Sequence, residues 1–149
     1  MPVAQVIAVC ISERKGEKKS DVGRCLLLDG LGLDGDAHAG YQHRQVSLLA
    51  EESIQKIREK GIDVGPGDFA ENLTTSGIDL VSLPVGTQLA VGRRILLEIS
   101  QIGKTCHSRC AIYRQVGDCV MPREGVFARV LQGGYVRKGD PIAVIDEQE

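Results

Sequence analysis

Short apolar segments that end at glycines place the strongest limit on the fold of this chain. The 149 residues include 18 glycines, and only 3% of the side chains are aromatic. Apolar, β-branched segments separated by tight turns are typical of strand-rich domains. Two segments share one form, a glycine-containing turn followed by alternating apolar residues, which suggests the wall of a barrel. Strands are predicted at residues 3–11, 22–28, 45–49, 85–92, 95–99 and 137–144.

These strands give a mostly β fold class. We expect a closed or partly open β-barrel of about seven or eight strands with a few short helices. The length suits one domain with one substantial core, so a single domain is predicted over residues 1–149. Segments 3–11 and 22–28 are expected to pair as a hairpin around a charged connection. The basic turn in that connection, residues 14–19, is expected to be solvated.

Two short helices are predicted from charge, spacing and stop signals. The first covers residues 51–60, because acidic side chains open it, basic ones follow and Gly61 ends it. Its side chains expected to face the core are Ile54 and Ile57. The second begins at Pro122 and stops at the glycine pair 133–134. It is predicted from three apolar residues at helical spacing: Phe127, Val130 and Leu131.

Charge and composition limit the partners and the compartment. The net charge is −2, so no sequence-wide electrostatic footprint for nucleic acid or an anionic membrane exists, and neither partner is expected. The chain has no apolar run of membrane-spanning length and no signal-peptide pattern at its start, so a cytoplasmic location is expected. The five cysteines are better explained as thiols or ligands than as disulfides. Cys10 and Cys25 lie in apolar segments and are expected to be buried.

Residues 103–110 are the best candidate for a working cysteine. They place two thiols, Cys106 and Cys110, beside His107 and two cations, Lys104 and Arg109. Neighbouring positive charge lowers a thiol pKa and yields the thiolate that acts as nucleophile or soft metal ligand. Two other interpretations stay open. One is three unconnected buried cysteines, and the other is a zinc site, although the spacing does not match paired CxxC motifs. The zinc site would use Cys106, His107, Cys110 and Cys119.

Two further segments carry polar side chains among glycines and apolar residues. In residues 32–44, four polar side chains could converge on a ligand, or the segment could be a surface loop built from ordinary turn residues. These four are Asp36, His38, His43 and Arg44. In residues 65–75, apolar neighbours would pull Glu71 and Asn72 toward the interior. There Glu71 could accept backbone N–H groups and Asn72 could cap a turn.

Taken in order, these segments resemble the MOSC domain family, named for the C-terminal region of molybdenum-cofactor sulfurases and also found as small stand-alone bacterial proteins. The resemblance covers nearly the whole chain. It rests on residues 32–40, 43–49 and 67–74, the cysteine segment, and a closing strand that contains Gly-Asp. It implies a mostly β, barrel-like fold and a pocket for a pterin-based cofactor or a sulfur-bearing intermediate. It also implies a cysteine that carries sulfur or ligates molybdenum.

The resemblance assigns roles to particular residues. The family's cysteine corresponds to Cys110, which follows Arg109 and precedes an apolar residue, or to Cys106, which would otherwise be a neighbouring or resolving thiol. The residues expected to line the pocket are Asp36, His38, His43, Arg44, Glu71 and Asn72. Those expected to contact a cofactor phosphate are Arg44, Lys104 and Arg109.

The function expected from the resemblance is binding of molybdenum cofactor or its pterin precursor and sulfur transfer, with Cys110 as sulfur acceptor or metal ligand. The group that the protein carries could also be persulfide sulfur alone, with no need for pyridoxal. Expected partners are the small-molecule cofactor and a sulfur donor protein. The alternative is a molybdenum-dependent reductase of N-hydroxylated compounds supplied with electrons by a partner, since no flavin or iron–sulfur motif is present. A zinc-stabilised interaction module is the second alternative.

Overall fold

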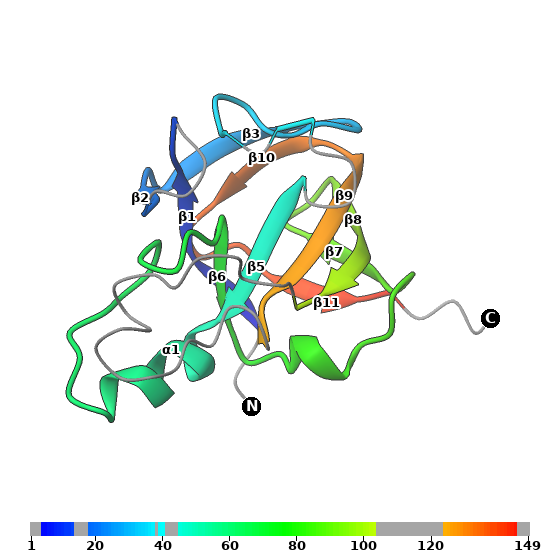
Figure 1. Cartoon of the computed structure of the whole chain (residues 1–149). Coiled ribbons are helices and arrows are strands. Elements are labelled where there is room, and N and C mark those ends of the chain that lie inside the picture. Colours follow the sequence, from blue (N-terminus) through cyan, green and yellow to red (C-terminus); the bar gives the residue numbers. More distant parts are fainter. Residues whose placement is uncertain (1–3, 14–17, 38, 41–44, 104–123, 146–149) are drawn as a thin grey trace.

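The fold was analysed in a computed structural model, which describes residues 4–13, 18–37, 39–40, 45–103 and 124–145 (Figure 1). The helices are α1 (Glu51–Arg58) and the short 3-10 helix η2 (Leu80–Ser82). Among the described residues, neither helix is long and apolar enough to cross a membrane. The strands are β1 (Gln5–Ile11), β2 (Ser20–Asp21), β3 (Arg24–Leu28), β4 (Gly32–Leu33), β5 (Val46–Ala50), β6 (Leu73–Ser76), β7 (Gln88–Val91), β8 (Ile95–Ile102), β9 (Val126–Gln132), β10 (Gly134–Arg137) and β11 (Ile142–Val144).

An eight-stranded sheet forms the body of the protein, in the order β11-β7-β8-β9-β5-β6-β1-β2. The sheet curls so that β1 meets the segment just before β11. There Gln5 pairs with Pro141, and the Val6 amide donates to the Asp140 carbonyl at 2.8 Å. The contact joins only a few residues of the two segments, so the sheet is a partly open barrel. This confirms the predicted fold class. Closing a sheet in this way reduces the number of unpaired strand edges.

The crossover from β5 through α1 to β6 joins two parallel strands, which need a long connection rather than a tight turn. Ile54 and Ile57 of α1 are buried, as predicted, and they pack in a cluster with Leu49 and Phe127 outside the barrel. Leu48 points the other way, into the barrel core. Strand β5 is therefore covered on both faces, which explains why it is almost uniformly apolar.

A small sheet of three strands, in the order β10-β3-β4, lies across one end of the barrel (Figure 1). Its inward side chains Cys25, Leu27 and Val136 belong to the main core cluster. Cys10 of β1 is fully buried as well. The expectation that Cys10 and Cys25 are buried is thus confirmed.

The predicted pairing of segments 3–11 and 22–28 as one hairpin is wrong. β1 pairs with the two-residue strand β2, whereas β3 pairs with β10 and β4 in the small sheet. Gly23, with φ 74°, lies between β2 and β3 and lets the chain turn away from β1. Pairing with β10, which is distant in sequence, therefore replaces the local hairpin.

The predicted second helix is also wrong, because residues 126–132 form β9. This strand lies between β8 and β5 and pairs with both. Val126, Ala128 and Val130 belong to the barrel core, while Phe127 packs in the cluster under α1. The outer face of β9 carries apolar residues as well, with Phe127 buried and Leu131 exposed, so three apolar residues of the strand happened to fit helical spacing.

Candidate functional site

Three segments that are distant in sequence meet at the carboxyl end of β1. The Ser12 amide donates to Asp36 Oδ1 at 3.0 Å, and Asn72 Nδ2 donates to the Cys10 carbonyl at 3.0 Å. The amide of Lys19 donates to the carbonyl of Gly67 at 2.8 Å. We call Ser12, Lys19, Asp36, Glu71 and Asn72 the β1 polar cluster; all five are buried. The structure thus brings Asp36 together with the Glu71–Asn72 segment, although 35 residues separate Asp36 from Glu71.

Lys19 and Asp36 form a buried ion pair with 2.7 Å between Nζ and Oδ1, and neither side chain is exposed to solvent. Lys19 Nζ also donates to Ser12 Oγ at 3.0 Å. The prediction of a solvated basic turn is therefore wrong at Lys19. The cause is tertiary, because Lys19 is held against the Gly67 loop and its side chain reaches the Asp36 carboxylate inside the protein.

Glu71 is fully buried and is tied to both sides of its own segment. Its Oε2 accepts the Gly67 amide at 2.9 Å and the Thr74 hydroxyl at 2.6 Å. The expectation that Glu71 accepts a backbone N–H is confirmed. Its other oxygen, Oε1, has no hydrogen-bond partner among the described residues. Burial disfavours the charged form and raises the pKa of Glu71, against the opposing hydrogen bond from Thr74.

Asn72 links three strands through its side chain and its backbone. Its Oδ1 accepts the Ser47 amide at 2.9 Å, and the Ser47 hydroxyl lies 3.2 Å from the same oxygen. Its Nδ2 donates to Cys10 in β1, as described above. Asn72 thus fixes the start of β6 between β5 and β1. A ligand contact of Asn72, and likewise of Glu71 and Asp36, stays a prediction.

The two described cysteines have the wrong chemistry for a nucleophile. Burial is the main cause that raises the pKa of the Cys10 thiol to about 12, and the charge of Glu71 adds to the increase. Burial also raises the pKa of the Cys25 thiol. A thiol that stays protonated at neutral pH is a poor nucleophile and a poor metal ligand. Neither Cys10 nor Cys25 is therefore suited to sulfur chemistry.

The other predicted site residues lie outside the described residues. Two glycines on either side of residues 104–123 are described, and the Gly103 amide donates to the Gly125 carbonyl at 2.6 Å. Within the described part of the chain, no group of three or more His, Cys, Asp or Glu side chains could hold a metal ion. The site residues that are not described are His38, His43, Arg44, Lys104, Cys106, Arg109 and Cys110, and the same holds for His107 and Cys119 of the possible zinc site.

Sequence reasoning missed Lys19 and three hydroxyl residues that support the site. These are Ser12, Ser47 and Thr74. Thr74 lies three residues after Glu71, a spacing that could have suggested a local hydrogen bond. Lys19 gave no such signal, because it stands in a basic segment that is typical of a solvated turn.

The MOSC domain model matches residues 34–143, a range that includes Asp36, Glu71 and Asn72. The chain belongs to the MOSC domain family. This family is linked to molybdenum cofactor, and the match spans most of the barrel together with Asp36, Glu71 and Asn72 of the β1 polar cluster. A comparison with curated proteins finds no match.

Solved structures similar to this MOSC domain share its fold. The YuaD protein from Bacillus subtilis has a TM-score of 0.82 and 21% identity, covering 99% of this chain and 98% of that one. YiiM from Geobacillus stearothermophilus has a TM-score of 0.71 and 19% identity, covering 96% and 75%. YiiM from Escherichia coli has a TM-score of 0.64 and 21% identity, covering 98% and 71%. At these identities the likeness concerns the fold alone.

The Gly67→Ala substitution is expected to destabilise this MOSC domain by about 2 kcal/mol. Gly67 has φ 87°, and a Cβ there would overlap the Lys19 carbonyl and lie 3.3 Å from Cys10 Sγ. Gly61→Ala is the matched control, since Gly61 has φ 89° and no atom within 4 Å of such a Cβ. The control isolates the backbone cost, about 1 kcal/mol. Equal unfolding free energies of the two variants in urea would show that the close approach at Gly67 is unimportant.

Proposed function

We propose that this MOSC domain binds molybdenum cofactor or its pterin precursor and carries sulfur on Cys110. The observation that carries the proposal is the convergence of two polar segments, around Asp36 and Glu71–Asn72, at the end of one strand. In a chain whose family is linked to molybdenum cofactor, such a convergence supports a ligand site beside the cluster. The cytoplasmic location and the sulfur donor partner remain expectations.

The side chains assigned to the site suit the cofactor chemically. Glu71 Oε1 is a buried acceptor without a partner among the described residues, as the N–H edge of a pterin ring requires. Arg44, Lys104 and Arg109 would hold the phosphate through charge-assisted hydrogen bonds. The Cys110 thiolate is a soft ligand of the kind that molybdenum takes. When bound, the cofactor would supply a metal centre able to accept sulfur.

Sulfur loading needs only one exchange at Cys110. The Cys110 thiolate attacks the terminal sulfur of a donor persulfide, R–S–SH, and a new S–S bond forms while the donor S–S bond breaks. The products are a Cys110 persulfide and the donor thiolate R–S⁻, so atoms and electrons balance without an added oxidant or reductant. Lys104 and Arg109, six residues or fewer from Cys110 in sequence, would stabilise the thiolate.

Intact mass after incubation with cysteine persulfide tests the proposal. We expect an adduct of about 32 Da, the mass of one sulfur atom, on wild-type protein. The adduct should be lost in Cys110→Ser and kept in the matched control Cys25→Ser, because Cys25 is buried. Loss in Cys106→Ser with retention in Cys110→Ser would move the role to Cys106. Wild-type loading in both variants would contradict the sulfur-carrier function.

Metal analysis of the purified protein separates this function from the alternatives. If the purified protein holds no tightly bound metal and takes up sulfur from the persulfide, the result supports the sulfur-carrier function. Stoichiometric molybdenum with visible absorbance would instead favour the reductase of N-hydroxylated compounds. About one zinc per chain, with unfolding on chelation, would identify a zinc-stabilised interaction module.

A further inference from the structure

A cavity of about 490 Å³ lies at the carboxyl ends of the parallel strands β5 and β6. One wall comes from the start of α1, and the other from the segment after β6 that leads into η2. Its apolar lining consists of Ala50, Ile78, Leu80 and Val81. Crevices at the carboxyl ends of parallel strands are common ligand sites, and this volume lies within the usual range for small ligands.

This cavity is distinct from the β1 polar cluster. Asn72 stands immediately before β6 and Gly77 immediately after it. An extended strand rises about 3.3 Å per residue, so these positions are about 16 Å apart. The cavity therefore has its own set of lining residues and goes beyond the proposed sulfur and cofactor function.

Within the described part of the chain, the charged residues that line the cavity make it negative. They are Glu52, Lys56, Asp79 and Glu124, three carboxylates and one ammonium. The amino end of α1 also lies here, but its dipole is equivalent to only about half a positive charge. The balance is therefore still negative, and it favours a positively charged ligand.

Two of these carboxylates have no compensating cation among the residues that the structure describes. Glu124 is paired with Lys56 at 2.9 Å and accepts the Ser53 hydroxyl at 2.5 Å. Glu52 Oε2 accepts the Gly77 amide at 3.0 Å. Asp79 Oδ2 accepts the Ser82 hydroxyl at 2.6 Å. Neither Glu52 nor Asp79 forms an ion pair within the described ranges. Each can therefore accept a further hydrogen bond from a cation.

We propose that this cavity binds a small organic cation with an apolar body, such as a protonated arylalkylamine. The ammonium group contacts the carboxylates of Glu52 and Asp79, where it replaces water as the hydrogen-bond donor. The apolar body packs against Ile78 and Val81, and Val81 is 40% exposed. Apolar contact supplies affinity, and the carboxylates select the charge.

Saturation-transfer NMR and calorimetric titration with benzylamine test this site. We expect benzylamine to bind, and its neutral and anionic counterparts, benzyl alcohol and benzoate, to bind at least about threefold more weakly. Asp79→Asn should raise the dissociation constant for benzylamine about threefold, and the Glu52→Gln/Asp79→Asn double variant about tenfold. The affinity for benzyl alcohol should change little, because the alcohol carries no charge.

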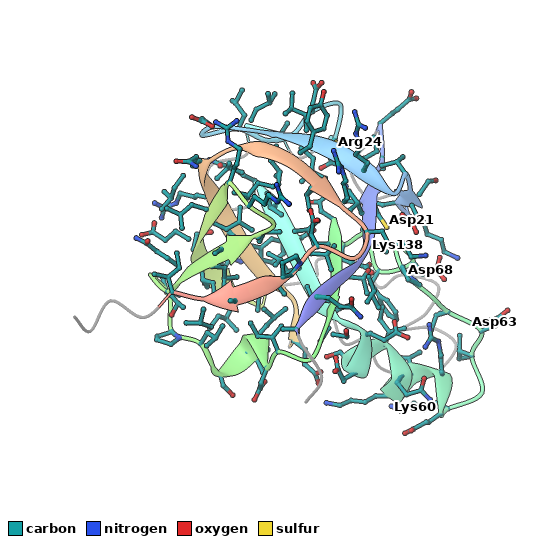
Figure 2. All side chains as sticks on the ribbon, turned by 180° about the vertical axis from the view of Figure 1, so that it is seen from behind. Asp21, Arg24, Lys60, Asp63, Asp68 and Lys138 are labelled. Atoms are coloured by element: carbon teal, nitrogen blue, oxygen red, sulfur yellow. The ribbon has the colours of Figure 1, made fainter. Side chains whose placement is uncertain are left out.

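Asp63→Asn is the matched control, because Asp63 lies on the loop after α1 and points away from the barrel (Figure 2). It removes the same charge and should leave benzylamine binding unchanged. Benzylamine binding that is absent, unaffected by the double variant or weaker than that of benzoate would overturn the proposal. Persulfide loading does not enter these measurements, so their failure would leave the proposed function untouched.

Discussion

Lys19→Met is expected to lower the free energy of unfolding by about 4 kcal/mol. The substitution removes a buried ammonium and leaves the Asp36 carboxylate in a site without solvent. Methionine keeps most of the side-chain volume, so the loss reports the charge rather than a cavity. Urea unfolding followed by far-UV circular dichroism measures it.

The neighbouring Lys18 supplies the control, because its side chain is exposed. Lys18→Met should change stability by no more than about 0.5 kcal/mol. Asp36→Asn in the Lys19→Met background should recover part of the lost stability, since it removes the buried carboxylate that Lys19 pairs with in the wild type. If Lys19→Met were as stable as Lys18→Met, the buried ion pair would not contribute to the fold.

Glu71→Ala is expected to destabilise the protein by about 3 kcal/mol. Alanine leaves the Gly67 amide and the Thr74 hydroxyl without an acceptor in a buried site, and it opens a cavity. Glu59→Ala, at an exposed glutamate at the end of α1, should cost only a few tenths of a kcal/mol. A Glu71→Ala variant as stable as this control would show that the carboxylate does not hold its loop.

Glu71→Gln separates the charge of this side chain from its shape. Because burial raises the pKa of Glu71 above its ordinary value of 4.5, the unfolded chain loses this proton at lower pH than the folded one. The contribution of Glu71 to stability is therefore complete below about pH 4.5 and declines as pH rises toward the folded pKa. Glutamine does not titrate, so the variant should gain stability relative to wild type over that window. A difference that stays constant with pH would contradict a raised pKa.

These predictions give the motif residues a structural role beside any role in binding. Asp36, Glu71 and Asn72 each make their described hydrogen bonds within the protein. Loss of function in a variant at these positions therefore has to be compared with its loss of stability. The Cys110→Ser variant avoids this problem in the loading experiment, because its readout is the mass of one adduct.

Local patterns explain which parts of the fold could be predicted. The helix at 51–58 follows from its charge order and from the spacing of Ile54 and Ile57, which concern neighbouring residues only. The burial of Glu71 follows from apolar residues on both sides of it. Within the site, the resemblance identified Asp36 and Glu71 as members of one group, and their segments meet in the structure.

The sequence by itself determined that this chain forms a strand-rich barrel with an amphipathic helix after residue 50 and buried Cys10 and Cys25, because glycine turns and apolar spacing act over a few residues. Only the tertiary structure decided that β3 leaves β1 for β10 and that residues 126–132 are a strand. It also decided that Lys19 is buried against Asp36. Strand pairing and the burial of a charge depend on partners distant in sequence, and no local pattern specifies those partners.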